Sequence, residues 1–336
     1  MHLARARRQT EDGPQTRIIA SDDPDDGWVD VRTHERLARQ RAGATPGAAA
    51  RIAAAIVPGS MSEALAGGDA FTDATRAAIA DSSGDARVAT PALTNALDPL
   101  AYRDFMCFEE HFSFGYRWQN KPVPEIMYEL PISYFGNPRA FIGPDDDVPW
   151  PHYTRRMDYE LELGIVIGRP CTNVTPDEAL NYVAGLTILN DFSARDIQGR
   201  EMGMGMGPQK SKDFAYGIGP WITTIDEFPA LDALSVRASV NGEECATGTT
   251  EGPIYSGAEL IAYVSIADRL QPGDIIGSGT VGNGSALELG RHLRAGDVVE
   301  LEVEGVGTLR SRFTATAEQY PWWPSEQADP FAAARS

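Results

Sequence analysis

One short stretch of strict alternation limits what this chain can fold into more than any other. Residues 159–168 read YELELGIVIG, and their alternating apolar side chains are Leu161, Leu163, Ile165 and Ile167. A period of two predicts a β-strand with these side chains on one face. Glu160 and Glu162 then share the opposite face, ~7 Å apart along the strand. An isolated Glu-x-Glu pair is typical of the solvent-facing side of a half-buried strand, so the pair alone indicates no chemistry.

A third carboxylate, that of Asp191, favours a different interpretation of the two glutamates. Asp191 follows the apolar run 183–189 and lies one crossover after the first strand. Three carboxylates presented from adjacent strands would repel one another unless a cation lay between them. Oxygen ligands suit a hard divalent ion better than zinc, and Mg²⁺ is the first choice, with Mn²⁺ or Ca²⁺ as alternatives. The sequence therefore predicts a divalent metal site.

Length, charge and cysteine content limit the class of protein. The 336 residues suffice for one large domain, with or without a small one. A formal net charge of -19 argues against nucleic acid or an anionic membrane as partner. No apolar segment follows the basic N-terminus, and the longest apolar run of the first hundred residues is too short to cross a bilayer. Cys107, Cys171 and Cys245 are scattered and indicate reduced thiols. We therefore expect a cytoplasmic protein.

The chain divides into three regions by composition. Residues 1–15 are polar, and we expect them to be disordered. Residues 16–98 are expected to form a small accessory domain that contains a hairpin and several short helices. The hairpin strands are predicted at 17–20 and 28–31, and the helices at 35–41, 48–56, 60–65 and 71–79. No chemical motif occurs in this region.

Residues 99–336 are expected to form the catalytic domain. A turn entering a helix is predicted over 101–112, and further helices over 176–184 and 256–270. Strands are predicted at 126–134, 159–168, 185–190, 218–224, 234–240, 275–280 and 298–303. Strands outweigh helices, so we expect a mainly β or α+β core with covering helices. The tail, with Pro321 to Pro324, is expected to pack on that core or on a neighbouring subunit.

Several motifs after residue 100 occur in a characteristic order. They are Asp104-Phe105 with His111 seven positions on, Pro131 to Tyr134, Glu160 to Glu162, Asn190 to Gln198, Lys212 to Phe214 leading into Gly219-Pro220-Trp221, and Gly277 to Thr280 with Glu288 eight positions further on. Over roughly residues 100–315, this order resembles the fumarylacetoacetate hydrolase family. The resemblance implies a mixed β-sandwich roll, a homodimer, and the small N-terminal domain of the longer members.

The resemblance also implies a set of metal ligands, namely Asp104, Glu160, Glu162 and Asp191. The residues themselves already predict a metal at the last three. Asp104 is added by the resemblance, because an aspartate before an aromatic residue is otherwise typical of a helix cap.

His111 and Glu288 fall where the family keeps its general base and the carboxylate that orients it. Such a pair can take a proton from water near pH 7. The alternative is a structural histidine, which is the more common role for a single His. Shorter family members use a glutamate near this position, so Glu110 is the alternative base.

Lys212 and several polar residues complete the predicted site. Four carboxylates and one divalent ion remain net negative, so a buried Lys212 would offset the excess and attract an acidic substrate; a surface lysine beside Lys210 is the alternative. By resemblance, the substrate contacts are Arg117, Tyr134, Arg195, Gln198 and Thr280, with Met106 and Met202 in place of tyrosines of the founding hydrolase. Arg117 is the candidate for a substrate carboxylate. Arg195 could instead pair with Asp191.

The resemblance implies a metal-dependent hydrolase that cleaves a carbon–carbon bond in a 1,3-dicarbonyl or acylpyruvate-like oxo acid. His111 and Glu288 would activate water, the metal would act as a Lewis acid that holds the enolate leaving group, and Lys212 would assist. Methionines in place of tyrosines predict a substrate other than fumarylacetoacetate. A lyase or isomerase at the same site, such as a 2-oxo-acid decarboxylase, hydratase or tautomerase, is the first alternative. A non-catalytic binding module is the second.

Overall fold

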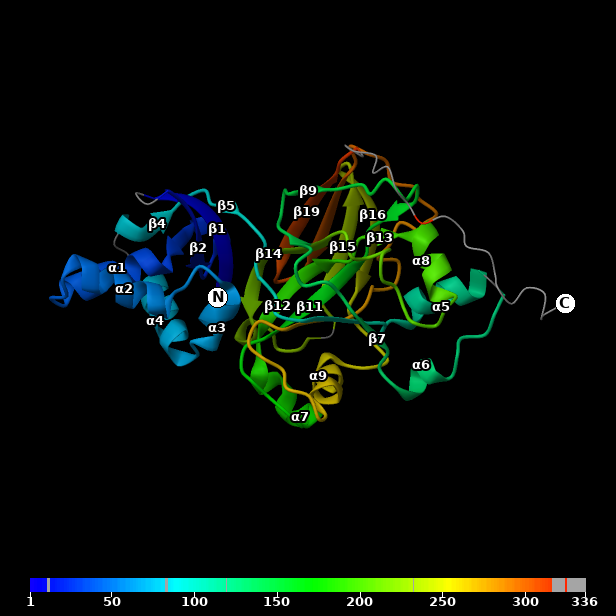
Figure 1. The fold of residues 1–336 in the computed structure, drawn as a ribbon, viewed down its shortest axis with the longest axis horizontal. Coiled ribbons are helices and arrows are strands. Elements are labelled where there is room, and N and C mark those ends of the chain that lie inside the picture. The colour runs from blue at the N-terminus through cyan, green and yellow to red at the C-terminus, as the bar shows by residue number, and fades with distance from the viewer. Residues whose placement is uncertain (11–12, 82–83, 119, 232, 316–323, 325–336) are drawn as a thin grey trace.

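A large mixed sheet runs through the molecule and joins its N-terminal part to the rest (Figure 1). The computed structural model describes residues 1–10, 13–81, 84–118, 120–231, 233–315 and 324. The strand order is β4-β3-β2-β1-β14-β12-β11-β17-β6-β7, with β5 paired to β1 and β8 paired to β14. These strands are β1 (His2–Thr10), β2 (Gly13–Ser21), β3 (Trp28–Asp30), β4 (Arg87–Val88), β5 (Ala92–Leu93), β6 (Tyr102–Phe105), β7 (Ser133–Phe135), β8 (Phe141–Ile142), β11 (Leu161–Ile167), β12 (Val183–Asn190), β14 (Tyr216–Thr224) and β17 (Ile275–Gly277).

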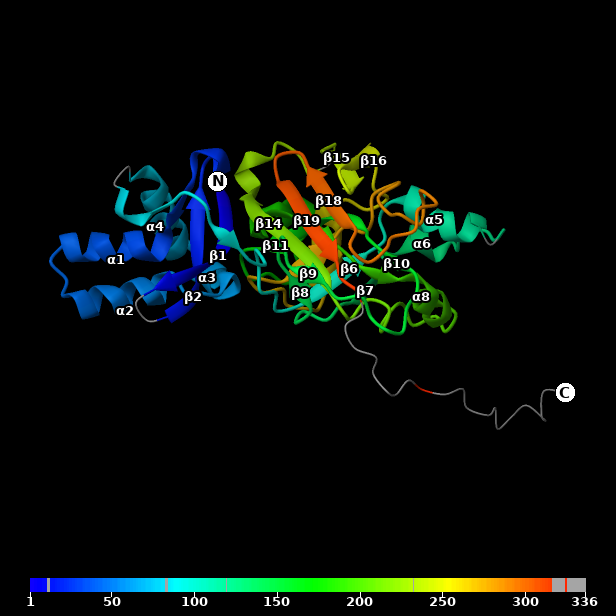
Figure 2. The ribbon, with the colours of Figure 1, turned by 90° about the horizontal axis from the view of Figure 1, so that it is seen from above.

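A second, five-stranded sheet packs against the large one, as the view from above shows (Figure 2). Its order is β16 (Glu243–Thr249), β15 (Ser235–Val240), β18 (Val298–Val303), β19 (Gly307–Phe313) and β9 (Asp147–Val148). A short pair, β10 (Met157–Asp158) and β13 (Ser193–Ala194), lies beside them. Leu163 and Ile165 of β11 share one core with Val236 and Leu301 of the second sheet. The predicted sandwich with covering helices is therefore confirmed.

Helices cover the large sheet at several places. At its N-terminal end lie α1 (Val31–Arg41), α2 (Pro46–Ile56), α3 (Met61–Ala66) and α4 (Asp69–Ala80), which confirm the four predicted helices (Figure 1). Further along the chain follow α5 (Glu109–Trp118), α6 (Ile126–Glu129), α7 (Pro176–Ala179), α8 (Arg195–Met202) and α9 (Gly257–Ser265). Single 3-10 turns are η1 (Pro24–Asp26), η2 (Gly84–Ala86), η3 (Leu180–Tyr182) and η4 (Ile225–Glu227). Within the described residues, no helix is long and apolar enough to cross a membrane.

The prediction that residues 1–15 are disordered was wrong. The hairpin of β1 and β2 occupies their described part, and β1 also pairs with β14, where Leu3 lies opposite Ile222. Leu3, Ala4 and Ala6 are buried. The composition of the segment is polar, but its partner strand β14 lies far away in the sequence, so local composition could not reveal that pairing. The accessory region predicted over 16–98 is thus joined to the rest by continuous strand pairing.

Other differences are smaller. The strand expected at 126–134 is helical in its first part, as α6, and becomes β7 only at Ser133. The segment 101–112 contains β6 before its helix, and β16 and β19 were not predicted. Strand β11 is buried along its whole length, which excludes the alternative of two solvent-facing glutamates on a half-buried strand. The prediction for the tail concerns Pro321 to Pro324, of which 321–323 lie outside the described residues.

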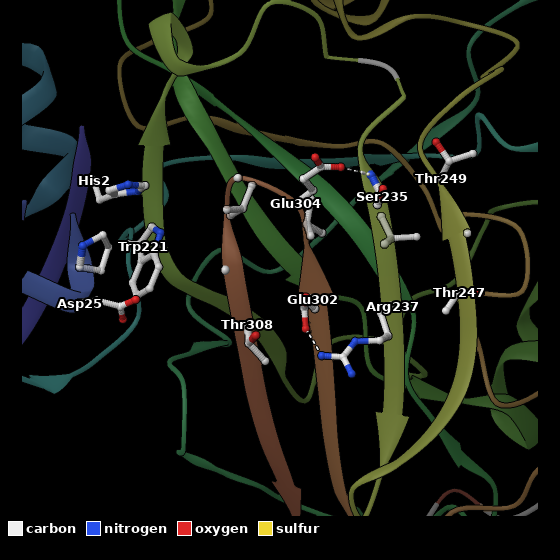
Figure 3. Close-up of a pocket in the computed structure, with 17 residues that line it drawn as sticks. His2, Asp25, Trp221, Ser235, Arg237, Thr247, Thr249, Glu302, Glu304 and Thr308 are labelled. Atoms are coloured by element: carbon white, nitrogen blue, oxygen red, sulfur yellow. Dashed lines mark hydrogen bonds and ion pairs between the residues drawn. The ribbon is translucent and has the colours of Figure 1, made fainter. Parts of the chain in front are cut away.

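An open groove of about 1030 Å³ separates the N-terminal strands from the second sheet (Figure 3). His2 and Trp221 lie on one side, and Arg237 on the other forms an ion pair with Glu302. Glu304 accepts a hydrogen bond from the Ser235 amide at 3.1 Å. The groove is lined by none of the candidate site residues.

Candidate active site

Three carboxylates from three segments converge in the large sheet. Asp104 lies on β6, Glu162 on β11, and Asp191 directly after β12; all three are buried. One oxygen of each lies within 4.8 Å of the others. Strand β17 lies between β11 and β6, and its Gly277 pairs with Gly164 on one side and with Asp104 on the other. A Cβ atom at Gly277 would lie only 2.2 Å from Asp104 Oδ1, so the glycine leaves the space that the cluster occupies.

The oxygens of this cluster fit a divalent ion. Asp104 Oδ1, Glu162 Oε2 and Asp191 Oδ1 are buried and have no hydrogen-bond partner among the residues that the structure describes. Burial raises the pKa of all three carboxyl groups, and the charge of Asp104 raises the pKa of Glu162 and Asp191 further. A bound cation would satisfy the three oxygens and favour the ionised forms. All-oxygen ligation suits ions of the Mg²⁺ class.

Glu160, the fourth predicted ligand, lies outside this cluster of three and is surrounded by cationic groups. Its Oε2 forms an ion pair with Lys212, and its Oε1 lies 2.8 Å from Arg195 Nη1 and 3.2 Å from His111 Nε2. Burial would raise the pKa of Glu160, but Arg195, Lys212 and His111 hold it well below its ordinary value. These cationic groups favour the ionised form of Glu160, and its role as a ligand stays a prediction.

Lys212 is buried among the carboxylates. Its side chain is 2% exposed, and its Nζ lies 2.5 Å from Asp191 Oδ2. Burial would lower the pKa of this lysine, but the charges of Asp191 and Glu160 raise it. The alternative of a surface lysine is therefore wrong.

His111 lies between two carboxylates. Its Nδ1 is 2.9 Å from Glu288 Oε2, and its Nε2 faces Glu160. Glu288 is itself oriented by the Ser285 hydroxyl at 2.7 Å and by the Asn283 amide at 3.1 Å. Burial would lower the pKa of His111, but the hydrogen bonds to Glu160 and Glu288 raise it to about 9. A divalent ion in the adjoining cluster would lower this pKa, because like charges repel. The alternative base, Glu110, is solvent-exposed.

Four of the predicted substrate contacts lie around this centre. Tyr134 donates to Asp191 Oδ2 at 2.8 Å, and Thr280 donates to Glu162 Oε1 at 3.2 Å. Arg195 pairs with Asp158 and Glu160 rather than with Asp191, and it donates to Gln198 Oε1 at 2.9 Å.

Within the described part of the chain, the other three predicted contacts form no hydrogen bond or ion pair with the carboxylates. Arg117 is exposed and donates to Ser113 and to the Glu110 carbonyl on its own helix. Met202 is 41% exposed, at the end of α8. Met106 is half-buried, and its backbone passes close to Gly279, where a Cβ atom would lie 3.0 Å from the Met106 Cα. Their roles toward substrate stay predictions.

Two acidic residues that contribute to the site were not singled out from the sequence. Asp158 binds Arg195, and Glu201 accepts hydrogen bonds from residues 209–211, which precede Lys212. The alternation does contain a signal for Asp158, because Asp158, Glu160 and Glu162 occupy every second position and so fall on the same face of an extended strand. No local pattern marks Glu201.

Known proteins support the assignment that this fold and site suggest. The family model described as "Fumarylacetoacetate (FAA) hydrolase C-terminal" matches residues 101–314. A 2,4-didehydro-3-deoxy-L-rhamnonate hydrolase from Sphingomonas sp. is 38% identical over 196 residues, which are 57% of this chain and 67% of that protein. An uncharacterized protein from Methanocaldococcus jannaschii is 40% identical over 194 residues, or 57% of this chain and 75% of that protein.

A solved structure extends the likeness over nearly the whole chain. The fumarylacetoacetate hydrolase from psychrophilic Exiguobacterium antarcticum superposes with a TM-score of 0.68 at 22% identity, covering 93% of this chain and 99% of that one. At this identity the likeness concerns the fold alone. The match of the family model to more than half of the chain shows the family. The chain belongs to the fumarylacetoacetate hydrolase family.

Proposed function

We propose that this enzyme is a metal-dependent hydrolase that cleaves a carbon–carbon bond in a 1,3-dicarbonyl or acylpyruvate-like oxo acid. The observation that carries the proposal is the pair of His111 and Glu288, 2.9 Å apart and beside the acidic cluster. A histidine oriented by a carboxylate is suited to take a proton from water. The match to a hydrolase of a sugar-derived acid in Sphingomonas sp. supports the same class of reaction.

Asp104, Glu162 and Asp191 would hold the divalent ion, with Glu160 as the fourth candidate ligand. Mg²⁺ is the first choice, with Mn²⁺ or Ca²⁺ as alternatives. When bound, the ion supplies Lewis-acid polarisation of the substrate oxygens. EDTA should therefore abolish turnover, and Mg²⁺ or Mn²⁺ should restore it.

The protein side chains would carry the proton and the charge. Glu288 accepts from Nδ1 of His111, so Nε2, which faces Glu160 in this structure, is the nitrogen that would take the proton of water. The water oxygen then bonds to the distal carbonyl carbon, and the carbon–carbon bond breaks. The electron pair of that bond stays on the departing fragment as an enolate, which later takes up a proton. Lys212 places a positive charge near this developing negative charge.

Isotope incorporation tests the proposal. Acylpyruvates incubated with the Mg²⁺-loaded enzyme in ¹⁸O-labelled water should yield a carboxylate product that contains one solvent oxygen. His111→Ala should lower kcat by about 10²–10⁴-fold while Mg²⁺ affinity stays unchanged, because His111 acts on water. Release of CO₂ without ¹⁸O in the organic product would instead support the decarboxylase alternative. Rearrangement without bond cleavage would support an isomerase. Metal binding without any turnover would support a binding module.

The proposal includes a homodimer in the cytoplasm. Cys107, Cys171 and Cys245 are free thiols, which is typical of a reducing compartment. Light scattering of the purified full chain would measure the assembly, and a mass of one chain would contradict the dimer.

A further inference from the structure

Asp158 makes contacts with two separate parts of the candidate site. It ends β10 and is 2% exposed. Its Oδ2 lies 2.7 Å from Nε and 2.6 Å from Nη2 of Arg195. The same carboxylate accepts hydrogen bonds from the amides of Tyr159 at 2.9 Å, Ala286 at 2.9 Å and Leu287 at 3.1 Å. Three amides and one guanidinium therefore define its position.

The first set of contacts leads through Arg195 to Glu160. Nη1 of Arg195 lies 2.8 Å from Glu160 Oε1. That same oxygen lies 3.2 Å from His111 Nε2. The planar guanidinium has a rigid geometry, so fixing its Nε and Nη2 on Asp158 also fixes the direction of Nη1.

The second set of contacts leads through the backbone to Glu288. Asp158 binds the amides of Ala286 and Leu287, the two residues that directly precede Glu288. Glu288 Oε2 lies 2.9 Å from His111 Nδ1. An isolated antiparallel β-bridge between the backbones of Glu160 and Ser285 joins the same two segments. Both nitrogens of one imidazole therefore face carboxylates whose positions depend on Asp158.

We propose that Asp158 is a positioning residue for His111, acting on one side through Arg195 and Glu160 and on the other through the backbone before Glu288. The proposal rests on the function proposed above, in which His111 is the base. Asp158 is no ligand and no proton carrier, because its oxygens are occupied by Arg195 and by backbone amides. A base displaced by about 1 Å can lose on the order of 10²-fold in rate, so a buried residue can limit turnover without touching substrate.

Asp158→Asn is the variant that tests this role. It keeps an oxygen for the backbone amides and removes the charge that holds Arg195. Asp30→Asn is the matched control, because Asp30 is also buried, accepts from the Thr33 amide and lies 3.8 Å from an arginine, Arg8, in the N-terminal part. Both variants lose one buried carboxylate, so they separate general destabilisation from an effect on the site.

The kinetic measurement is a double-mutant cycle with Glu288→Gln on the Mg²⁺-loaded full chain. We expect Asp158→Asn to lower kcat on the order of 10²-fold, with KM and Mg²⁺ affinity changed less than about twofold. In the Glu288→Gln background the same substitution should cost less than about twofold, because the residues act as one unit. Asp30→Asn should leave kcat unchanged. Losses that multiply in the double variant, or an unchanged kcat in Asp158→Asn, would overturn the proposal.

The second measurement does not depend on turnover. In the proton NMR spectrum, the imidazole N–H shared by His111 and Glu288 should give a low-field signal that Asp158→Asn removes and Asp30→Asn retains. A signal retained in Asp158→Asn overturns the positioning role. If the wild-type enzyme hydrolyses no acylpyruvate, the proposed function fails while this test still stands. If the Asn variant does not fold, Asp158→Glu keeps the charge and displaces the carboxylate by one methylene, and its low-field signal is judged in the same way.

Discussion

Nζ of Lys212 lies 2.5 Å from Oδ2 of Asp191, and the lysine side chain is 2% exposed. A lysine this buried is stable as a cation only because the negative charges of Asp191 and Glu160 compensate its positive charge. The positive charge of Lys212 in turn stabilises the ionised forms of both carboxylates. Removing one partner of a buried ion pair leaves the other charge without compensation.

Lys212→Met should therefore destabilise the metal-free protein. We expect the free energy of unfolding to fall by about 3–5 kcal/mol. Mg²⁺ should recover part of this loss, because it supplies the missing positive charge. Urea unfolding with and without Mg²⁺ measures both effects. Lys210→Met is the control, since Lys210 is exposed and lies over the ring of Tyr153. Equal unfolding free energies for the two variants would contradict the expectation.

Gly277→Ala should impair metal binding while leaving the fold intact. The new Cβ would lie 2.2 Å from Asp104 Oδ1 and 3.0 Å from Glu162 Oε2, so at least one carboxylate must move. Displaced ligands typically cost about 10–100-fold in metal affinity. Calorimetric titration with Mg²⁺ measures the affinity. Gly47→Ala is the control, because its nearest neighbour would be an arginine side chain at 3.6 Å. Unchanged Mg²⁺ affinity in Gly277→Ala would place the ion elsewhere.

Glu201 should contribute stability that depends on pH. Its carboxylate accepts from the amides of Gln209 at 2.9 Å and Lys210 at 2.8 Å, and from the Ser211 hydroxyl at 2.6 Å. Burial raises the pKa of Glu201, but the hydrogen bonds from Ser211 and from residues 209–211 outweigh it and lower the pKa below the ordinary 4.5.

A lowered pKa in the folded state means that this contribution is fully present above the unfolded-state pKa and disappears as the pH falls through the folded-state pKa. Glu201→Gln should therefore be less stable than the wild type at pH 7, by about 1 kcal/mol. Urea unfolding from pH 7 down into acid should show the difference shrinking below pH 4.5. A difference that stays constant over this range would mean that the charge of Glu201 contributes nothing.

The substrate pocket should favour an apolar distal group. The family resemblance implies that Met106 and Met202 replace residues with hydroxyl groups in the founding member, and an apolar wall discriminates weakly between chain lengths. We expect kcat/KM to be higher for acylpyruvates with alkyl or aryl ends than for one with a distal carboxylate. The measurement is a series of acylpyruvates and 3-oxo acids that differ only at that end. Fastest turnover of the distal carboxylate would refute the idea, and Met202→Tyr should shift the preference toward it.

Local sequence patterns predicted much of this structure, because hydrophobic periodicity and the order of motifs can be recognised without knowing which distant segments are in contact. The alternation of 159–168 predicted strand β11, and the apolar run before Asp191 predicted the neighbouring strand β12, which pairs with β11. Three carboxylates on these neighbouring strands, Glu160, Glu162 and Asp191, were sufficient to predict a metal site. The four N-terminal helices were likewise predicted from their own segments of sequence.

The tertiary structure decided which charges meet. Asp104 reaches the cluster only because β17, from far along the chain, places Gly277 between Asp104 and Gly164. Glu160 and Glu162 are two residues apart on one strand, yet the first faces Arg195 and Lys212 while the second belongs to the cluster of unpaired oxygens. Glu288 approaches His111 across 177 positions of sequence. Partners of this kind depend on strand register and packing over long separations, and local periodicity does not contain that information.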